Sequence, residues 1–250
     1  MNEYGLIGYP LQHSFSKKYF TDKFEREGLN NCIFNLFPLP SITDLTTLLH
    51  THKDLKGLAV TIPFKVEVIP FLDKLDDTVE RIAAVNCIQI TDGKLTGFNT
   101  DVTGFEKTFT PFLKNHHSGA LILGTGGASK AVQYVLNKIG MPFLVVTRSE
   151  NSQSLHIPYK LITGELLKNY PVIINCTPVG MYPDDYKKPD IPYHLLSALN
   201  YLYDLVYNPS RTLFLKEGEK YGAVVKNGFD MLVIQAEENW KIWNGNGERI

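Results

Sequence analysis

The chain has 250 residues, of which 44% are hydrophobic and 20% are charged, and its formal net charge is −1. This length accommodates one large domain or two modest ones. A balanced charge without basic runs argues against a nucleic-acid partner or an anionic membrane surface. No stretch reaches the roughly 18 apolar residues of a membrane span, and no apolar signal core follows Met1, so we expect a soluble, cytoplasmic protein.

The three cysteines, Cys32, Cys87 and Cys176, are far apart in the sequence and lie in apolar runs. An odd number of scattered cysteines favours buried, reduced thiols over disulfide bonds or metal ligands. We therefore expect no metal site.

Apolar runs and turn residues alternate along the first part of the chain in the pattern of an α/β protein. The pattern predicts strands over residues 4–8, 32–37, 57–61 and 85–91, and helices over 16–27, 41–51 and 65–72. Near residue 100 the character changes, because a polar turn leads into a helix and the polar stretch 114–118 follows. A second α/β pattern begins there.

Two polar clusters fall at the starts of predicted helices. Ser14 and Ser16 offer two hydroxyls, of which one would suffice as a helix N-cap, so the pair could instead hold a carboxylate. Lys65 follows the strand end Thr61 and would lie in a first helical turn, where a cation is locally unfavourable. The positive helix end would lower the lysine pKa toward the range of a general base; an ordinary surface lysine is the alternative.

Two further polar residues stand out in this part of the chain. Asn86 lies inside an apolar strand, so its amide must be paired, either structurally or by a ligand. Asp101 closes a polar turn before a helix, where it could serve as an N-cap or contact a ligand.

The second part starts with the apolar strand 120–123, a glycine-rich turn and a helix from Ser129 onward. The free N–H groups and positive end of such a helix bind the pyrophosphate of a dinucleotide. The spacing Gly124-Thr125-Gly126-Gly127-Ala128-Ser129 departs from the common G-x-G-x-x-G pattern, so a tight turn without a ligand is the alternative.

The next strand, 143–146, ends in Thr147, Arg148 and Ser149. An acidic residue at this point would bind the ribose hydroxyl of NAD, whereas an arginine suits the 2′-phosphate of NADP. The sequence therefore predicts NADP as the cofactor.

Further strands are predicted over 172–175, 201–205 and 223–226, and a final amphipathic helix over 231–243. This order predicts a two-domain α/β fold. Residues 1–103 and 230–250 would form a substrate-binding domain, and 104–229 a Rossmann-type NADP-binding domain, with the last helix returning to the first domain. The substrate would bind in the cleft between the domains.

Taken in order, these motifs resemble the shikimate dehydrogenase family over nearly the whole chain. The matching segments are Ser14-Phe15-Ser16, Thr61-Ile62-Pro63-Phe64-Lys65, Asn86, Asn99-Thr100-Asp101, Gly124 to Ser129, Asn175-Cys176-Thr177-Pro178-Val179-Gly180-Met181, Asp204-Leu205-Val206-Tyr207-Asn208-Pro209 and Gly228 to Gln235. The resemblance implies an NADP-dependent oxidoreductase that interconverts 3-dehydroshikimate and shikimate in the pathway to chorismate and the aromatic amino acids. It implies a monomer or a homodimer acting on a small molecule.

The resemblance also implies a role for each matching residue. Lys65 and Asp101 would be the catalytic pair beside the reacting hydroxyl. The substrate would be bound by Ser14 and Ser16 at its carboxylate, by Thr61, Asn86, Asp101 and Gln235 at its ring hydroxyls, and by Tyr207. The cofactor would be bound by Gly124, Thr125, Gly126, Gly127, Ala128, Ser129, Thr147, Arg148, Ser149, Thr177, Gly180, Gly228 and Met231.

Three positions depart from the family pattern. Ala59 stands where the family usually has Asn, Lys17 replaces a usual proline, and residues 151–153 lack the second basic residue that many members carry after Arg148. The last departure predicts a weaker preference for NADP over NAD.

Three alternative functions remain open from the sequence. They are a quinate or mixed quinate/shikimate dehydrogenase that also uses NAD, a folate-linked dehydrogenase of similar architecture, and a non-catalytic module that senses NADP or shikimate. The presence of Lys65 and Asp101 argues against the non-catalytic module.

Overall fold

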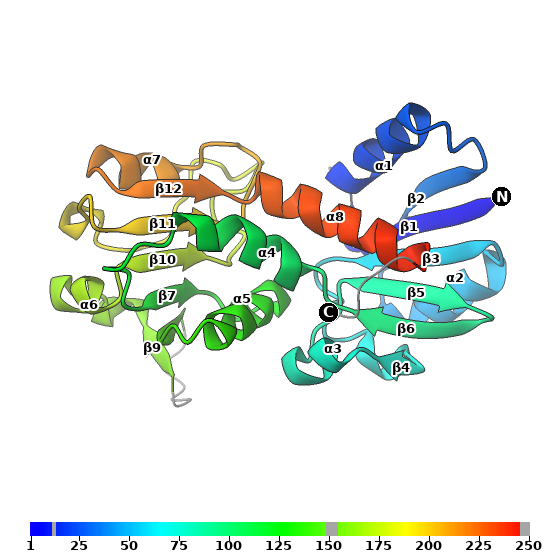
Figure 1. Cartoon of the computed structure of the whole chain (residues 1–250), viewed down its shortest axis with the longest axis horizontal. Coiled ribbons are helices and arrows are strands. Elements are labelled where there is room, and N and C mark those ends of the chain that lie inside the picture. The colour runs from blue at the N-terminus through cyan, green and yellow to red at the C-terminus, as the bar shows by residue number, and fades with distance from the viewer. Residues whose placement is uncertain (12–13, 149–154, 246–250) are drawn as a thin grey trace. The chain divides into compact units, whose positions relative to one another are not determined.

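A computed structural model describes residues 1–11, 14–148 and 155–245 (Figure 1). The chain divides into two units. Unit 1 comprises Met1–Thr100 with Gln235–Ile250, and unit 2 comprises Asp101–Ile234. From the sequence we expected the divisions a few residues away, at 103/104 and 229/230. The first division falls at the start of helix α4 (Asp101–Phe109), and the second falls inside helix α8 (Phe229–Trp243).

Unit 1 is built on a mixed six-stranded sheet in the order β2-β1-β3-β5-β6-β4. Its strands are β1 (Asn2–Gly8), β2 (Cys32–Pro38), β3 (Leu55–Val60), β4 (Lys74–Leu75), β5 (Cys87–Thr91) and β6 (Lys94–Phe98). Strand β1 is parallel to β2 and β3, whereas β5 is antiparallel to β3 and β6. Because alternate residues of a strand face opposite sides, Leu58 and Ala59 enter two different apolar cores.

The helices of unit 1 are α1 (Phe15–Arg26), α2 (Leu45–Thr51), α3 (Asp77–Ile82) and the last part of α8. The helix predicted over 65–72 is wrong. Residues 62–68 form turns, and only a short 3₁₀ helix, Ile69–Phe71, follows. Pro70 lacks the N–H that an α-helix would need there, and the β-branched Val66, Val68 and Ile69 lower helix propensity further.

Trp243, near the end of α8, anchors this helix to the sheet of unit 1. The indole Nε1 donates a hydrogen bond of 3.0 Å to the carbonyl of Ile88, and the ring stacks on Tyr4. Gly57 in β3 lies so close that a Cβ at this position would overlap the indole ring. The sheet therefore accepts this tryptophan only because residue 57 has no side chain.

We expect Gly57→Ala to lower the free energy of unfolding by about 1–3 kcal/mol, because the added methyl must displace the Trp243 ring. Urea unfolding measures the change. Gly164→Ala is the matched control, because a Cβ at Gly164 makes only an ordinary contact with Leu195 at 3.7 Å. Equal stabilities of the two variants would contradict the expected overlap.

Unit 2 contains a second six-stranded sheet, in the order β12-β11-β10-β7-β8-β9, in which every described pairing is parallel. The strands are β7 (Ala120–Leu123), β8 (Phe143–Thr147), β9 (His156–Pro158), β10 (Val172–Asn175), β11 (Tyr201–Asp204) and β12 (Val224–Asn227). Numbered from β7, the order is 3-2-1-4-5-6, which is that of Rossmann dinucleotide-binding sheets. Ligands of such sheets bind at the carboxyl ends of the strands, where the strand order reverses between β7 and β10.

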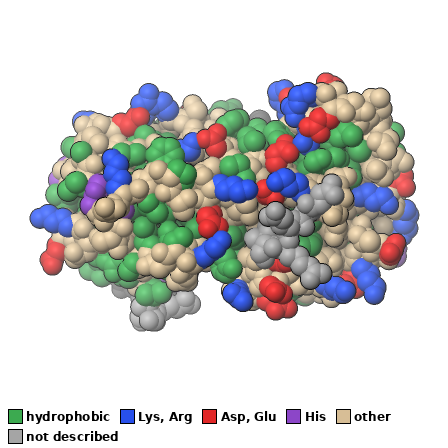
Figure 2. Space-filling model, in the orientation of Figure 1, with side chains coloured by type: hydrophobic (Ala, Val, Ile, Leu, Met, Phe, Trp, Pro, Cys, Tyr) green, Lys and Arg blue, Asp and Glu red, His purple; other side chains and the backbone are tan. Residues whose placement is uncertain are grey.

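The remaining helices of unit 2 are α5 (Gly127–Lys138), α6 (Gly164–Asn169) and α7 (Leu213–Lys220), beside α4 and the first part of α8. Among the described residues, no helix is long and apolar enough to cross a membrane. On the face shown in Figure 2, acidic and basic side chains are interspersed.

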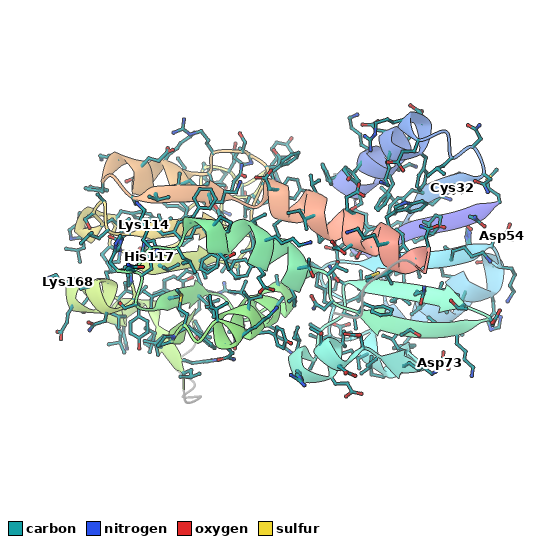
Figure 3. The ribbon with its side chains drawn as sticks, viewed as in Figure 1. Cys32, Asp54, Asp73, Lys114, His117 and Lys168 are labelled. Carbon is teal, nitrogen blue, oxygen red and sulfur yellow. The ribbon has the colours of Figure 1, made fainter. Side chains whose placement is uncertain are left out.

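A histidine is buried near the amino end of β11. His117 stacks on the Tyr201 ring, and its Nδ1 accepts a hydrogen bond of 3.1 Å from the backbone N–H of Lys114, which lies beside it in Figure 3. Burial lowers the pKa of His117, and the nearby His116 and Lys114 act in the same direction. The folded chain therefore favours the neutral ring.

This lowered pKa predicts that His117 destabilises the protein in acid. Below its ordinary pKa of about 6.5 the unfolded chain takes up a proton that the folded chain resists, so stability falls as the pH drops from 7 toward 5. In His117→Asn, whose amide oxygen can still accept the Lys114 bond, urea unfolding across this range should show a shallower fall. An unchanged slope would exclude His117 as a cause of acid sensitivity.

Candidate functional site

One predicted site residue of unit 1, Thr61, lies just past the carboxyl end of a parallel strand. Thr61 follows β3, and its backbone N–H donates to the carbonyl of Ile7 in β1 at 3.0 Å. Gly8 ends β1 so close to Thr61 that a Cβ there would overlap the threonine methyl. Two residues earlier in β3, Ala59 is buried in the apolar core that contains Tyr4 and Trp243, where a methyl group fits without a polar partner.

Ser14 occupies the N-cap position of α1, but its side chain makes no capping hydrogen bond. Within the described residues, its buried Oγ has no hydrogen-bond partner at all. Ser16 is buried in the first turn of the same helix. Buried hydroxyls are normally hydrogen-bonded, and a serine that served only as an N-cap would bond to an N–H of its helix. Ser14 makes no such bond, so a capping role alone does not explain this serine. An orphaned hydroxyl is what a carboxylate-binding site would leave.

Asn86 lies one residue before β5, not inside the strand as predicted, and it is buried in a network of amides and hydroxyls. Its Nδ2 donates to Thr100 Oγ1 at 2.9 Å and to Gln235 Oε1 at 3.4 Å. The Thr100 hydroxyl donates to Asn239 Oδ1 at 2.7 Å. The structure thus brings two predicted substrate residues, Asn86 and Gln235, together.

Thr100 and Asn239, which support these two residues, were not predicted as site residues. Asn239 follows Gln235 by one helical turn, so both project from the same side of α8. The i, i+4 spacing of the two amides, Gln235 and Asn239, was the signal available in the sequence.

Lys65 lies half-buried in the turn after β3, and its carbonyl accepts a hydrogen bond of 2.6 Å from the N–H of Val85. This bond places the lysine backbone beside the segment that carries Asn86. The predicted helix does not start at Lys65, because residues 62–68 form turns. Asp101, in unit 2, is the buried first residue of α4.

The glycine-rich turn of unit 2 follows β7 as predicted. Gly124 has a φ of +103°, and a Cβ there would meet the Thr177 methyl at 2.8 Å, so this position requires glycine. Gly126 is the N-cap of α5 and faces open space. The exposed Thr125 and Gly126 are followed by the half-buried Gly127 and Ala128 in the first helical turn.

Helix α5 therefore begins two residues before the predicted start. Its first N–H groups have no partner within the helix, which makes this terminus suitable for a pyrophosphate. Ser129, however, is fully buried, and its Oγ accepts a hydrogen bond of 3.1 Å from Gln133 Nε2. Its hydroxyl is thus engaged with Gln133 inside the protein.

Arg148 is exposed directly after β8, and Thr147 is the buried last residue of that strand. Thr147 pairs with Pro158, the last residue of β9, and Tyr159 follows as the first residue of a 3₁₀ helix. Burial raises the pKa of Tyr159, and the charge of the nearby Arg148 opposes this rise. The guanidinium thus lies near a partly buried aromatic ring. Ser149 falls outside the described residues.

The other predicted residues of unit 2 follow β10, β11 and β12. Thr177 is held by Asn175, whose Oδ1 accepts from the Thr177 N–H at 3.1 Å and from its hydroxyl at 2.6 Å. Gly180 has a φ of +90°, and Gly228 contacts the backbone of Leu205 so closely that a Cβ would overlap it. Tyr207 is half-buried after β11, and Met231 is buried in α8.

One buried acid, Asp204, was matched to a family motif but was not predicted as a site residue. It ends β11 and accepts hydrogen bonds from Asn175, Val206 and Thr212. Burial raises its pKa to about 6, although these three bonds act against the rise.

Unit 2 thus combines a Rossmann strand order, a glycine turn at a helix N-terminus and an arginine after the second strand. Unit 1 contains a cluster of hydroxyls and amides. Fold and site together define a two-domain, dinucleotide-dependent oxidoreductase.

Comparison with known proteins identifies the family. Residues 6–88 match the family model described as the shikimate dehydrogenase substrate binding domain. A curated relative from Methanococcus maripaludis, named shikimate dehydrogenase (NADP(+)), is 37% identical and covers 96% of this chain and 91% of its own. The chain belongs to the shikimate dehydrogenase family.

Solved structures agree with this assignment. A shikimate 5-dehydrogenase from Thermus thermophilus, in complex with NADP(H) and shikimate, superposes with a TM-score of 0.85 at 28% identity, over 98% of this chain and 94% of its own. A quinate dehydrogenase from Corynebacterium glutamicum, in complex with NAD, gives a TM-score of 0.85 at 26% identity over the same shares of the two chains. The fold is therefore shared by relatives that differ in substrate and in cofactor.

Proposed function

We propose that this chain interconverts 3-dehydroshikimate and shikimate with NADP as the hydride carrier. The observation that carries the proposal is the polar cluster of unit 1. The amides of Asn86 and Gln235 are hydrogen-bonded to each other, and elsewhere in unit 1 the buried Ser14 hydroxyl has no hydrogen-bond partner among the described residues. A carboxylate with several ring hydroxyls is the kind of ligand that such donors and acceptors recognise. The 37% identical relative that carries the name shikimate dehydrogenase (NADP(+)) supports the same substrate.

In this proposal the residues of unit 1 bind and orient the substrate. Ser14 and Ser16 bind the carboxylate through neutral hydroxyls, and Thr61, Asn86 and Gln235 bind ring hydroxyls. Thr100 and Asn239 hold the two amides in one orientation, because their hydrogen bonds fix which amide atom faces inward.

Lys65 and Asp101 handle the proton of the reacting hydroxyl. Oxidation of an alcohol removes a hydride from carbon and a proton from oxygen, so a base at the oxygen completes the reaction. NADP, when bound, supplies the hydride chemistry. Tyr207 contacts the substrate from unit 2.

The residues of unit 2 fit a dinucleotide phosphate. The backbone of Gly124 to Ser129 meets the pyrophosphate, and Arg148, with Thr147 and Ser149 beside it, meets the 2′-phosphate. Thr177, Gly180 and Gly228, in the loops after β10 and β12, and Met231, in α8, lie beside the nicotinamide. All proposed residues come from one chain, so both a monomer and a homodimer could carry out the reaction. The three free thiols suit a reducing compartment, and we place the reaction in the cytoplasm.

Initial rates for shikimate and quinate, each with NADP and with NAD, test this proposal. We expect the highest kcat/KM for shikimate with NADP. A higher kcat/KM for quinate, or no turnover of either acid, would overturn it.

A second candidate, a quinate or mixed quinate/shikimate dehydrogenase with relaxed cofactor use, is favoured by one observation. Residues 151–153 lack a second cation to support Arg148. Comparable kcat/KM values for the two cofactors and the two acids in the same experiment would establish this candidate.

A further inference from the structure

Asp204 lies at the carboxyl end of β11, directly opposite Asn175 at the end of β10 in the strand register. This edge of the sheet is where the loops around a bound dinucleotide begin. Asp204 is fully buried, and among the described residues its carboxylate is not part of any ion pair. Burying a carboxylate without a cation is unfavourable, so packing alone does not explain an acid at this position.

The two carboxylate oxygens of Asp204 connect three segments. Oδ1 accepts from Asn175 Nδ2 at 2.9 Å and from the Val206 N–H at 3.0 Å. Oδ2 accepts from the Thr212 hydroxyl at 2.6 Å. One side chain therefore joins the end of β10, the loop after β11 and the N-cap of α7.

The bond to Asn175 has a consequence for the loop after β10. An ionised carboxylate only accepts hydrogen bonds, so it requires the NH₂ group of Asn175 to face it. The Oδ1 atom of Asn175 must then face the other way, where it accepts from the N–H and hydroxyl of Thr177. The Thr177 hydroxyl in turn accepts from the Val179 N–H at 3.3 Å.

The bond to Val206 acts on the loop after β11. Fixing the Val206 N–H also orients its carbonyl, which accepts from the N–H of Gly228 at 3.3 Å. Gly228 precedes α8, and Tyr207 follows Val206. The loops that carry Thr177, Tyr207 and Gly228 thus depend on the same carboxylate.

We infer that Asp204 is a positioning residue, whose carboxylate holds the Thr177 loop and the Tyr207 loop in the arrangement that receives the cofactor and the substrate. The inference rests on the proposed function, which assigns these loops to the site. Asp204 itself acts only through its hydrogen-bond partners.

Asp204→Ala tests the inference. Hydrogen–deuterium exchange of the ligand-free protein should show the amides of Thr177, Val179 and Val206 exchanging about tenfold faster, because each lies in the network that the carboxylate organises. Calorimetric titration without substrate should show NADP binding weakened about tenfold. The KM for shikimate should rise by more than kcat falls.

Asp204→Asn keeps one acceptor oxygen and the shape of the side chain, so we expect about threefold changes in the same measurements, between wild type and Asp204→Ala. If the alanine variant does not fold, Asp204→Asn tests the inference in its place. Tyr203→Phe is the matched control. Tyr203 precedes Asp204 on β11, and the change removes its buried hydrogen bond to Thr108 without touching either loop. The control should lose stability and keep wild-type exchange in the loops and wild-type NADP affinity.

Loop exchange and NADP affinity within twofold of wild type in the folded Asp204 variants would overturn the inference, and so would equal effects in Tyr203→Phe. These readouts need no turnover. A wild-type chain that fails to oxidise shikimate, while the variants still change exchange and NADP binding, would refute the proposed function and leave the positioning role intact.

Discussion

Replacing Lys65 with alanine is expected to lower kcat for shikimate oxidation by at least about 100-fold, the usual scale of general acid–base catalysis. The KM for shikimate should change little, because the hydroxyls and amides of unit 1 provide most of the proposed binding contacts. A loss confined to kcat means that the lysine contributes to the transition state and not to ground-state binding.

The control for this variant is Lys56→Ala, which removes an exposed lysine from β3 in the same unit. It should retain wild-type kcat. Lys65→Ala should also recover part of its activity when a small primary amine is added, because the amine can replace the missing base. Near-wild-type turnover of Lys65→Ala would remove this residue from the proton-transfer step.

Replacing Arg148 with alanine is expected to weaken NADP binding about 10- to 100-fold while NAD binding changes much less. A charge-assisted hydrogen bond to a phosphate contributes about 1.5–3 kcal/mol, and only NADP carries the 2′-phosphate. Calorimetric titration of both cofactors measures the difference. Arg81→Ala, at an exposed arginine in α3 of unit 1, controls for the loss of one positive charge.

Equal losses for the two cofactors would show that Arg148 does not distinguish them. Because residues 151–153 provide no second cation, Arg148 should account for most of the cofactor preference of this chain.

The central strands of both sheets could be predicted because their residues are buried on two faces and therefore form continuous apolar runs. β7 and β10 have the bounds that the sequence predicts. Strands β4, β6 and β9 were missed, since β4 has only two residues and β6 contains a glycine and polar residues. Helix α3 was also missed, although Asp76 caps it by accepting a hydrogen bond from the Thr78 N–H. That cap was readable as a helix start.

The residues proposed to contact substrate or cofactor were easier to predict than the residues that hold them in place. Lys65, Asn86 and Arg148 are residue types that stand out against their apolar surroundings. Thr100 and Asn239 are bonded to each other across 139 positions of sequence, and Asn175 and Asp204 across 29, so neither pairing follows from local pattern. The helix predicted over 65–72 failed for a local reason, because Pro70 cannot donate the N–H bond that an α-helix needs there.

The orphaned hydroxyl of Ser14 has a consequence for how this chain could change under selection. Among the described residues this buried hydroxyl has no partner, and leaving a buried hydroxyl unpaired costs a folded protein roughly 1–3 kcal/mol. Selection for greater stability would therefore favour an apolar residue at this position, whereas selection for carboxylate recognition would keep the serine. A serine that makes no capping bond at this helix start is what the proposed carboxylate recognition predicts, and keeping it lowers stability.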